Sequence, residues 1–144
     1  MRRVALAASS PPLLTDQQGL GKWFDRGFVV YTEKAKCEVL GLEPIELARE
    51  GVVSAAIAKR LAEQALERSD AGASVGVTGF AGPAGQRDEA GLVYLAVTTR
   101  NGYLCQRECH FGDVGRDRTR ALAARAALEM LDDALSAYNP GDAA

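Results

Sequence analysis

The chain has 144 residues, a formal net charge of -2 at pH 7 and a pI of about 5.5. Hydrophobic residues make up 47% and charged residues 25%, which is typical of a globular domain with a hydrophobic core. This charge gives no general attraction to nucleic acid or to an anionic membrane, and no apolar run is long enough to span a bilayer. We therefore expect neither a nucleic-acid partner nor a membrane partner.

The whole chain, 1–144, is interpreted as a single domain. Residues 1–12 form a divergent start, and the small polar tail at 137–144 is expected to be flexible. The first residues combine two arginines with a short apolar stretch, but Pro11 and Pro12 interrupt it. That pattern does not indicate a signal for export.

The three cysteines are Cys37, Cys105 and Cys109. An odd number without a disulfide framework is typical of reduced thiols, which indicates a cytoplasmic protein. Cys105 and Cys109 would point to one face of a strand, and the single histidine, His110, follows them. These residues are too few and wrongly spaced for a zinc site, so we expect no metal.

The first half of the chain predicts one strand followed by three helices. A β-branched and aromatic run at 26–32 predicts the strand. Helices predicted at 33–41 and 44–51 each end at a glycine. Ser54 is placed to cap a longer helix at 55–69, whose alanine-rich apolar stripe allows close packing on a sheet.

The second half predicts three strands. They are expected at 72–80, 90–100 and 102–111. The dipeptide Asn101-Gly102 separates the last two runs, and it predicts a hairpin between them.

A final helix is expected to begin at Asp113 or Asp117 and to end near Ser136. Leu122 and Met130 belong to its inward face. Strands mixed with helices, together with one hairpin, predict an α/β fold: a layered domain with a mixed β-sheet flanked by helices.

The stretch VTGFAGPAG, residues 77–85, joins the end of a predicted strand to a glycine-rich loop. Glycines at such a place allow the backbone to approach a ligand closely. Considered alone, Gly79 and Gly82 are equally typical of turn residues.

Several stretches in order resemble the CinA C-terminal domain family: WFDRGFVVYTEKAK, GVVS, VTGFAGPAG, and FGD before an arginine-rich helix. The resemblance covers about residues 13–135. It implies a CinA C-terminal domain-like fold and a homo-oligomer. The family includes amidohydrolases that convert nicotinamide mononucleotide to nicotinate mononucleotide and ammonia. The resemblance therefore implies nicotinamide mononucleotide or a related nucleotide as ligand, and no cofactor.

The resemblance also implies catalytic residues. Lys36 matches the family lysine that activates a serine nucleophile, and Tyr31 matches the tyrosine beside it. A lysine can act as a base only if burial or nearby positive charge lowers its pKa. Without the family context, Lys36 would be interpreted as a solvated helix residue and Tyr31 as a packing residue.

Substrate-binding residues follow from the same resemblance. Thr78, Gly79 and Gly82 match the family's glycine loop. Arg120 is the best match for an arginine of the last helix, with Arg118 as its close competitor. Loop amides can donate to a phosphate or an oxyanion, and an arginine can bind a phosphate with two hydrogen bonds.

The family's serine motif is missing from the expected place. An alignment without gaps puts Val4, which has no nucleophilic atom, at the serine position and predicts impaired catalysis. A local slip of five or six residues would bring Ser9 or Ser10 there instead. Whether the chain is an enzyme stays open, and the alternative is a non-catalytic nucleotide-binding or protein-interaction and regulatory member of the family.

Overall fold

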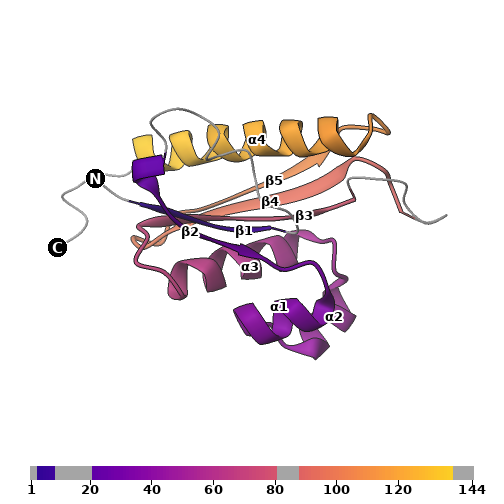
Figure 1. Ribbon diagram of the computed structural model, residues 1–144, viewed down its shortest axis with the longest axis horizontal. Coiled ribbons are helices and arrows are strands. Elements are labelled where there is room, and N and C mark those ends of the chain that lie inside the picture. The colour runs from indigo at the N-terminus through magenta and orange to yellow at the C-terminus, as the bar shows by residue number, and fades with distance from the viewer. Residues whose placement is uncertain (1–2, 9–20, 81–87, 138–144) are drawn as a thin grey trace.

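Five strands form one mixed sheet in the computed structural model, which describes residues 3–8, 21–80 and 88–137 (Figure 1). Their spatial order is β2-β1-β3-β4-β5, with β1 parallel to β2 and β3, and β4 antiparallel to β3 and β5. The strands are β1 (Val4–Ala8), β2 (Phe24–Val29), β3 (Ala73–Gly79), β4 (Leu92–Thr99) and β5 (Leu104–His110). The predicted mixed sheet is confirmed.

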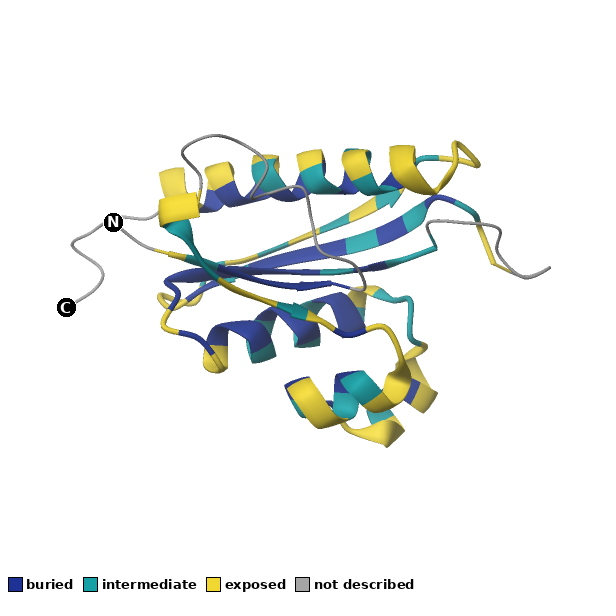
Figure 2. Cartoon of the chain, in the orientation of Figure 1, coloured by how far each residue is buried: buried dark blue, intermediate teal, exposed yellow. Residues whose placement is uncertain are grey.

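Helices cover both faces of the sheet (Figure 1). α4 lies on one face, and α3 lies on the other with α1 and α2 beyond it. The helices are α1 (Glu33–Leu40), α2 (Pro44–Glu50), α3 (Ala55–Glu67) and α4 (Arg116–Ser136), and a short 3-10 helix, η2 (Gly21–Trp23), precedes β2. The sides of α3 and α4 that face the sheet are buried, as Figure 2 shows. In the described part of the chain, no helix has the length and apolar character needed to cross a membrane.

β1 is the strand that the sequence analysis does not assign. Its residues from Ala5 to Ala8 are at most 6% exposed. Leu6 and Ala8 pack in the core beneath α4, whereas Ala5 and Ala7 pack in the core on the α3 side. A strand covered on both faces shows no alternation of polar and apolar residues, and an alanine-rich run has little intrinsic strand preference. The sequence signal for β1 was therefore weak.

The boundary between β2 and α1 differs from the prediction. A strand is predicted at 26–32, but β2 ends at Val29. Thr32 instead caps α1, because its Oγ1 accepts a hydrogen bond from the Ala35 amide at 3.0 Å. A threonine favours a strand by composition but also serves as a helix cap, and here the cap prevails.

The other predicted helices are confirmed with one correction. α1 and α2 end at Gly41 and Gly51, and the Ser54 hydroxyl caps α3 by accepting from the Ile57 amide at 3.2 Å. α4 begins at Arg116, immediately after Gly115, whose φ is 91°. Neither Asp113 nor Asp117 occupies the cap, because the left-handed turn at Gly115 starts the helix between them.

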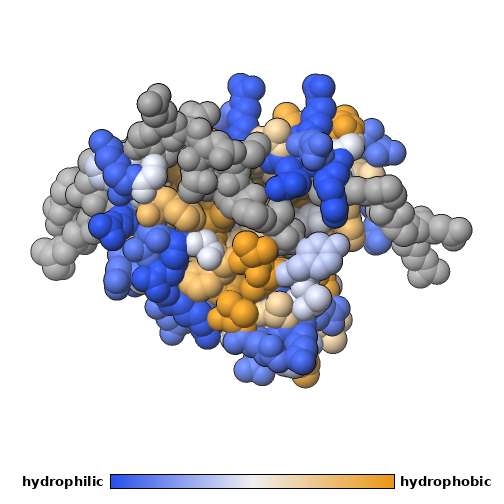
Figure 3. All heavy atoms as spheres, viewed as in Figure 1, coloured by the Kyte–Doolittle hydropathy of each residue, from blue (hydrophilic) through white to orange (hydrophobic). Residues whose placement is uncertain are grey.

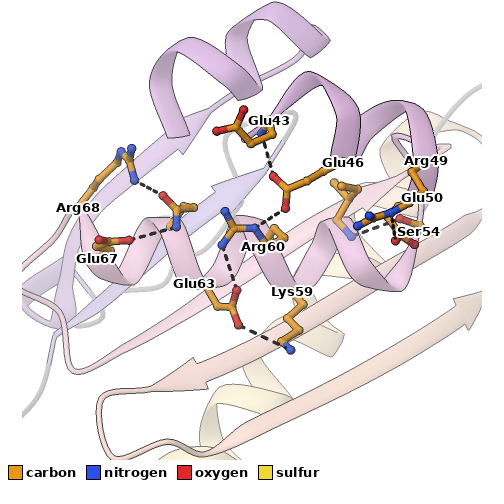
Figure 4. A network of polar contacts seen from close by, with 12 residues as sticks. Glu43, Glu46, Arg49, Glu50, Ser54, Lys59, Arg60, Glu63, Glu67 and Arg68 are labelled. Atoms are coloured by element: carbon orange, nitrogen blue, oxygen red, sulfur yellow. Dashed lines mark hydrogen bonds and ion pairs between the residues drawn. The ribbon is translucent and has the colours of Figure 1, made fainter. Parts of the chain in front are cut away.

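An ionic network fixes α2 against α3 (Figure 4). The Arg60 Nε donates to Glu46 Oε1 at 2.7 Å, and Glu46 Oε2 accepts from the Glu43 amide at 2.8 Å. These two hydrogen bonds hold the pKa of the Glu46 carboxyl below its ordinary value, with the backbone bond as the larger cause. α1, the helix that carries Lys36, contacts both α2 and α3, so the network lies in the helices next to it.

Candidate functional site

Lys36 is a buried lysine at the carboxyl end of β2. Only 3% of the residue is exposed. Its Nζ donates to the backbone carbonyls of Val30 and Tyr31, each at 3.2 Å. Burial lowers the pKa of this ammonium, and the negative charge of Glu33 offsets part of that effect. Among the described residues, no carboxylate forms an ion pair with Nζ, so the group is poised to lose its proton more readily than a surface lysine.

The position of Lys36 follows from the local sequence. Thr32 caps α1 directly after β2, and the Lys36 amide donates to the Thr32 carbonyl at 3.0 Å in the first turn. Leu40 of α1 packs in the same buried cluster as Val30, with Phe28 of β2 against it, so α1 turns back toward the end of the strand that precedes it. This geometry brings the long Lys36 side chain to the carbonyls of Val30 and Tyr31, the two residues that follow β2.

The end of β1 lies at the same place. The Val30 amide donates to the Ala8 carbonyl at 3.1 Å, and the Val30 carbonyl accepts from Lys36 Nζ. Val30 thus connects the carboxyl end of β1 with the lysine. Ser9 and Ser10, which come next in the sequence, lie outside the described residues.

Val4 lies at the other end of β1. It pairs with Phe24 and Ala73, and Ala8 pairs with Val29. Four residue steps of about 3.3 Å place the two ends of the strand about 13 Å apart. The alignment without gaps therefore does not bring Val4 next to Lys36.

The Tyr31 carbonyl accepts a hydrogen bond from Lys36 Nζ, and the residue as a whole is 69% exposed. Val29 and Val39 are also exposed large apolar residues, one at the end of β2 and one on α1. Figure 3 shows apolar side chains gathered over β2 and α1 on this face of the molecule. An apolar surface therefore lies beside the buried ammonium.

Thr78 and Gly79 lie at the carboxyl end of β3. Thr78 is buried, and its hydroxyl donates to the Val52 carbonyl at 2.9 Å, which ties the segment before α3 to the strand. A Cβ on Gly79 would lie 2.6 Å from the Leu92 carbonyl oxygen, so close packing on β4 requires glycine. The pairing of β3 with β1 ends at Gly76, so Val77–Gly79 extend beyond it.

Gly82 lies outside the described residues. Arg118 and Arg120 lie in the first turns of α4, where Arg118 is exposed and Arg120 is half-buried. α4 covers the face of the sheet opposite α1, and its first turn lies at the end of the molecule where β3 ends (Figure 1). The arginines thus share an edge of the sheet with Lys36 but approach it from the other face.

The structure therefore gathers Lys36, the Tyr31 backbone, the end of β1 and the end of β3 at one edge. In parallel sheets this carboxyl edge is where ligands commonly bind. The sequence analysis did not identify Val30 and Val52. Both accept hydrogen bonds through backbone carbonyls, which every residue has, so their residue type gives no indication of this role. Among the described residues, no group of three histidine, cysteine or acidic side chains is arranged to hold a metal ion.

Comparisons with known proteins identify the family. A family model for the CinA C-terminal domain matches residues 10–135. The nicotinamide-nucleotide amidohydrolase PncC of Escherichia coli is 38% identical over 122 residues, which cover 83% of this chain and 73% of PncC. A CinA-like protein of Thermosynechococcus vestitus is 40% identical over 122 residues, but this chain spans only 29% of its length.

Solved structures agree with these sequence matches. The competence/damage inducible protein CihA of Agrobacterium tumefaciens superposes with a TM-score of 0.85 at 40% identity, covering 92% of this chain and 84% of that one. A CinA superfamily protein of Escherichia coli gives a TM-score of 0.80 at 31% identity, covering 90% and 78%. The chain belongs to the CinA C-terminal domain family.

Proposed function

We propose that the chain is a metal-independent amidohydrolase that converts nicotinamide mononucleotide to nicotinate mononucleotide and ammonia. The single observation that carries the proposal is the buried Lys36 at the carboxyl edge of the sheet. Burying a lysine that forms no ion pair costs folding free energy, and such a cost is typical of a functional group. The name of the PncC relative supplies the substrate class.

Ser9 or Ser10 supplies the nucleophile in this proposal. Ala8 is held to Val30, and Val30 is held to Lys36, so the chain leaves β1 beside the ammonium. Ser9 and Ser10 follow Ala8 directly in the sequence, which makes their hydroxyls the candidates for the nucleophile. Since Val4 lies at the other end of β1, its identity is a weak reason to expect impaired catalysis. Impairment nevertheless remains a prediction that the assay below tests.

The reaction then follows ordinary acyl-transfer chemistry. Neutral Lys36 takes the proton of the serine hydroxyl as Oγ attacks the carboxamide carbon. The C–N bond breaks, the lysine returns the proton to the leaving nitrogen, and ammonia departs. Water then attacks the resulting ester with the lysine again as base, which releases nicotinate mononucleotide and restores the serine.

The other predicted residues bind the substrate in this proposal. Backbone amides of the loop that includes Gly79 and Gly82 donate to the oxyanion or the phosphate, and Arg120 binds the phosphate. The Thr78 hydroxyl already donates to the Val52 carbonyl, so Thr78 fixes the end of β3 that precedes the loop. Tyr31 and the apolar surface beside it face the pyridine ring. We further propose a homo-oligomer and a cytoplasmic location, on the resemblance and the cysteine usage.

The test is nicotinate mononucleotide formation from nicotinamide mononucleotide, followed by chromatography. Lys36→Ala is expected to lower kcat by about 10²- to 10⁴-fold, the usual contribution of a general base. Lys34→Ala is the matched control, because Lys34 lies on the same helix with its side chain 82% exposed. Ser9→Ala and Ser10→Ala identify the nucleophile, since one of them should abolish turnover.

Two results would contradict the proposal. Equal rates for the unsubstituted protein and Lys36→Ala would remove the lysine from catalysis. Calorimetric binding of nicotinamide mononucleotide without turnover would instead support a nucleotide-binding member of the family that has lost catalysis.

A further inference from the structure

His110, the single histidine of the chain, lies between two carboxylates at the end of β5. Its Nε2 contacts Glu108 Oε1 at 2.9 Å, and its Nδ1 makes a close contact with Glu89 Oε2. Glu108 belongs to β5, whereas Glu89 lies in the turn that leads into β4. The imidazole thus joins two segments of the chain.

The two contacts require a particular protonation state. An ionised carboxylate only accepts hydrogen bonds, and a neutral imidazole has a single N–H to donate. Only the protonated ring, with a hydrogen on each nitrogen, can donate to Glu89 and Glu108 together. When the proton leaves, one ring nitrogen faces a carboxylate oxygen with no hydrogen between them.

The turn that Glu89 belongs to is a junction of three strands. The Gly91 amide donates to the Phe80 carbonyl at 2.8 Å, next to the end of β3, and the Phe111 amide donates to the Gly91 carbonyl at 3.0 Å, next to the end of β5. Leu92, the first residue of β4, pairs with His110. Any interaction that fixes Glu89 therefore restrains the edge where β3 ends.

Other titratable groups lie on the described segments around the imidazole. Asp88 precedes Glu89 in the turn, and Tyr94 of β4 lies opposite Glu108. α3 packs against β4 and β5 and carries Lys59, whose Nζ pairs with Glu63 at 3.8 Å. The hydrogen bonds to Glu89 and Glu108, in that order, raise the pKa of His110 above its ordinary value of 6.5.

We propose that Glu89, His110 and Glu108 form a pH-responsive clamp that tightens the junction of β3, β4 and β5 when the imidazole is protonated and loosens it when the proton leaves. The clamp does not depend on the proposed amidohydrolase activity. Because the folded-state pKa is raised, the clamp is complete below the ordinary histidine pKa and is lost as the pH rises through the raised value.

The first test is a proton NMR titration of the full chain, in which a single histidine needs no assignment. The wild-type imidazole should titrate above 6.5, and both Glu89→Gln and Glu108→Gln should lower that pKa. Glu129→Gln is the control. Glu129 of α4 pairs with Arg107 on the face of the sheet that α4 covers, so its substitution should leave the histidine titration unchanged. A wild-type pKa at or below 6.5, or one insensitive to both substitutions, would overturn the clamp.

The second test is amide hydrogen exchange at Gly91 and Phe111. Their protection factors should fall about two- to fivefold between pH 5.5 and 8.5, in keeping with the small energy of exposed ion pairs. In His110→Asn the protection factors should not change with pH, and the Val97 amide in the middle of β4 provides the internal reference. An equal fall in wild type and His110→Asn would show that the junction does not respond to the imidazole.

Discussion

The Lys36 ammonium is buried between two backbone carbonyls, so its protonation and the stability of the fold are linked. Burial lowers the pKa of the folded-state amine below the ordinary 10.5. At pH values between the lowered pKa and 10.5, the unfolded chain binds more protons than the folded chain. The free energy of unfolding therefore increases with pH in that range. Below the lowered pKa, both the folded and the unfolded chain carry the protonated amine. The free-energy cost of burying its charge therefore no longer changes with pH.

We therefore expect wild type to gain stability relative to Lys36→Met as the pH is raised from 7 to 10. Urea denaturation at several pH values measures this difference. Lys34→Met on the same helix serves as the control, because it removes an ammonium whose side chain is 82% exposed rather than buried. Parallel pH profiles for wild type and Lys36→Met would mean that Lys36 is not desolvated in the folded protein.

At the scale of single residues, the sequence identifies which residues matter at the site better than it predicts what each of them contacts there. Lys36 is identified by resemblance, but its burial depends on the packing of α1 against the end of β2. Tyr31 is predicted for its side chain, yet its backbone carbonyl contacts the ammonium. The Thr78 hydroxyl bonds to Val52, 26 positions earlier, a pairing that only the folded chain creates.

At the scale of elements, the close approach of α3 to β3 depends on small residues. A Cβ on Gly76 would lie 2.3 Å from the Ala58 carbonyl oxygen and 2.6 Å from the Ala62 nitrogen. Both contacts are to helix backbone, which cannot move aside as a side chain can. We expect Gly76→Ala to lower the free energy of unfolding by about 3 kcal/mol, the upper range for an overpacked core.

Chemical denaturation measures this effect, and Gly21→Ala is a matched control, because nothing lies within 4 Å of the Cβ that it would add. A Gly76→Ala protein as stable as the control would mean that α3 can shift away from the sheet without cost.

Helices are predicted more accurately than strands in this chain, because helix signals are local. Ser54 lies next to the helix that it caps, and Gly41 and Gly51 end the helices that they follow. β1 has no such signal, since its residues become a strand only through pairing with β2 and β3. The boundary of β2 was misjudged for a related reason, because Thr32 suits both a strand and a helix cap.

At the scale of the whole molecule, β1 joins the two larger hydrophobic cores. Leu6 packs in the core beneath α4, while its neighbours Ala5 and Ala7 pack in the core on the α3 side. A strand shared in this way couples the packing of the two layers, so loss of one layer is expected to destabilise the other. We therefore expect the domain to unfold in a single cooperative step.

Leu6→Ala tests this coupling. Leu6 is 2% exposed, and loss of a buried leucine side chain should lower the free energy of unfolding by about 2 to 5 kcal/mol. Fluorescence of the single tryptophan, Trp23, reports on the β2 edge, and far-UV circular dichroism reports on the helices. The two urea transitions should move together, whereas Leu104→Ala, at a residue 42% exposed on β5, should move neither by more than about 1 kcal/mol. Separate midpoints in Leu6→Ala would show that the layers fold independently and that β1 does not unite them.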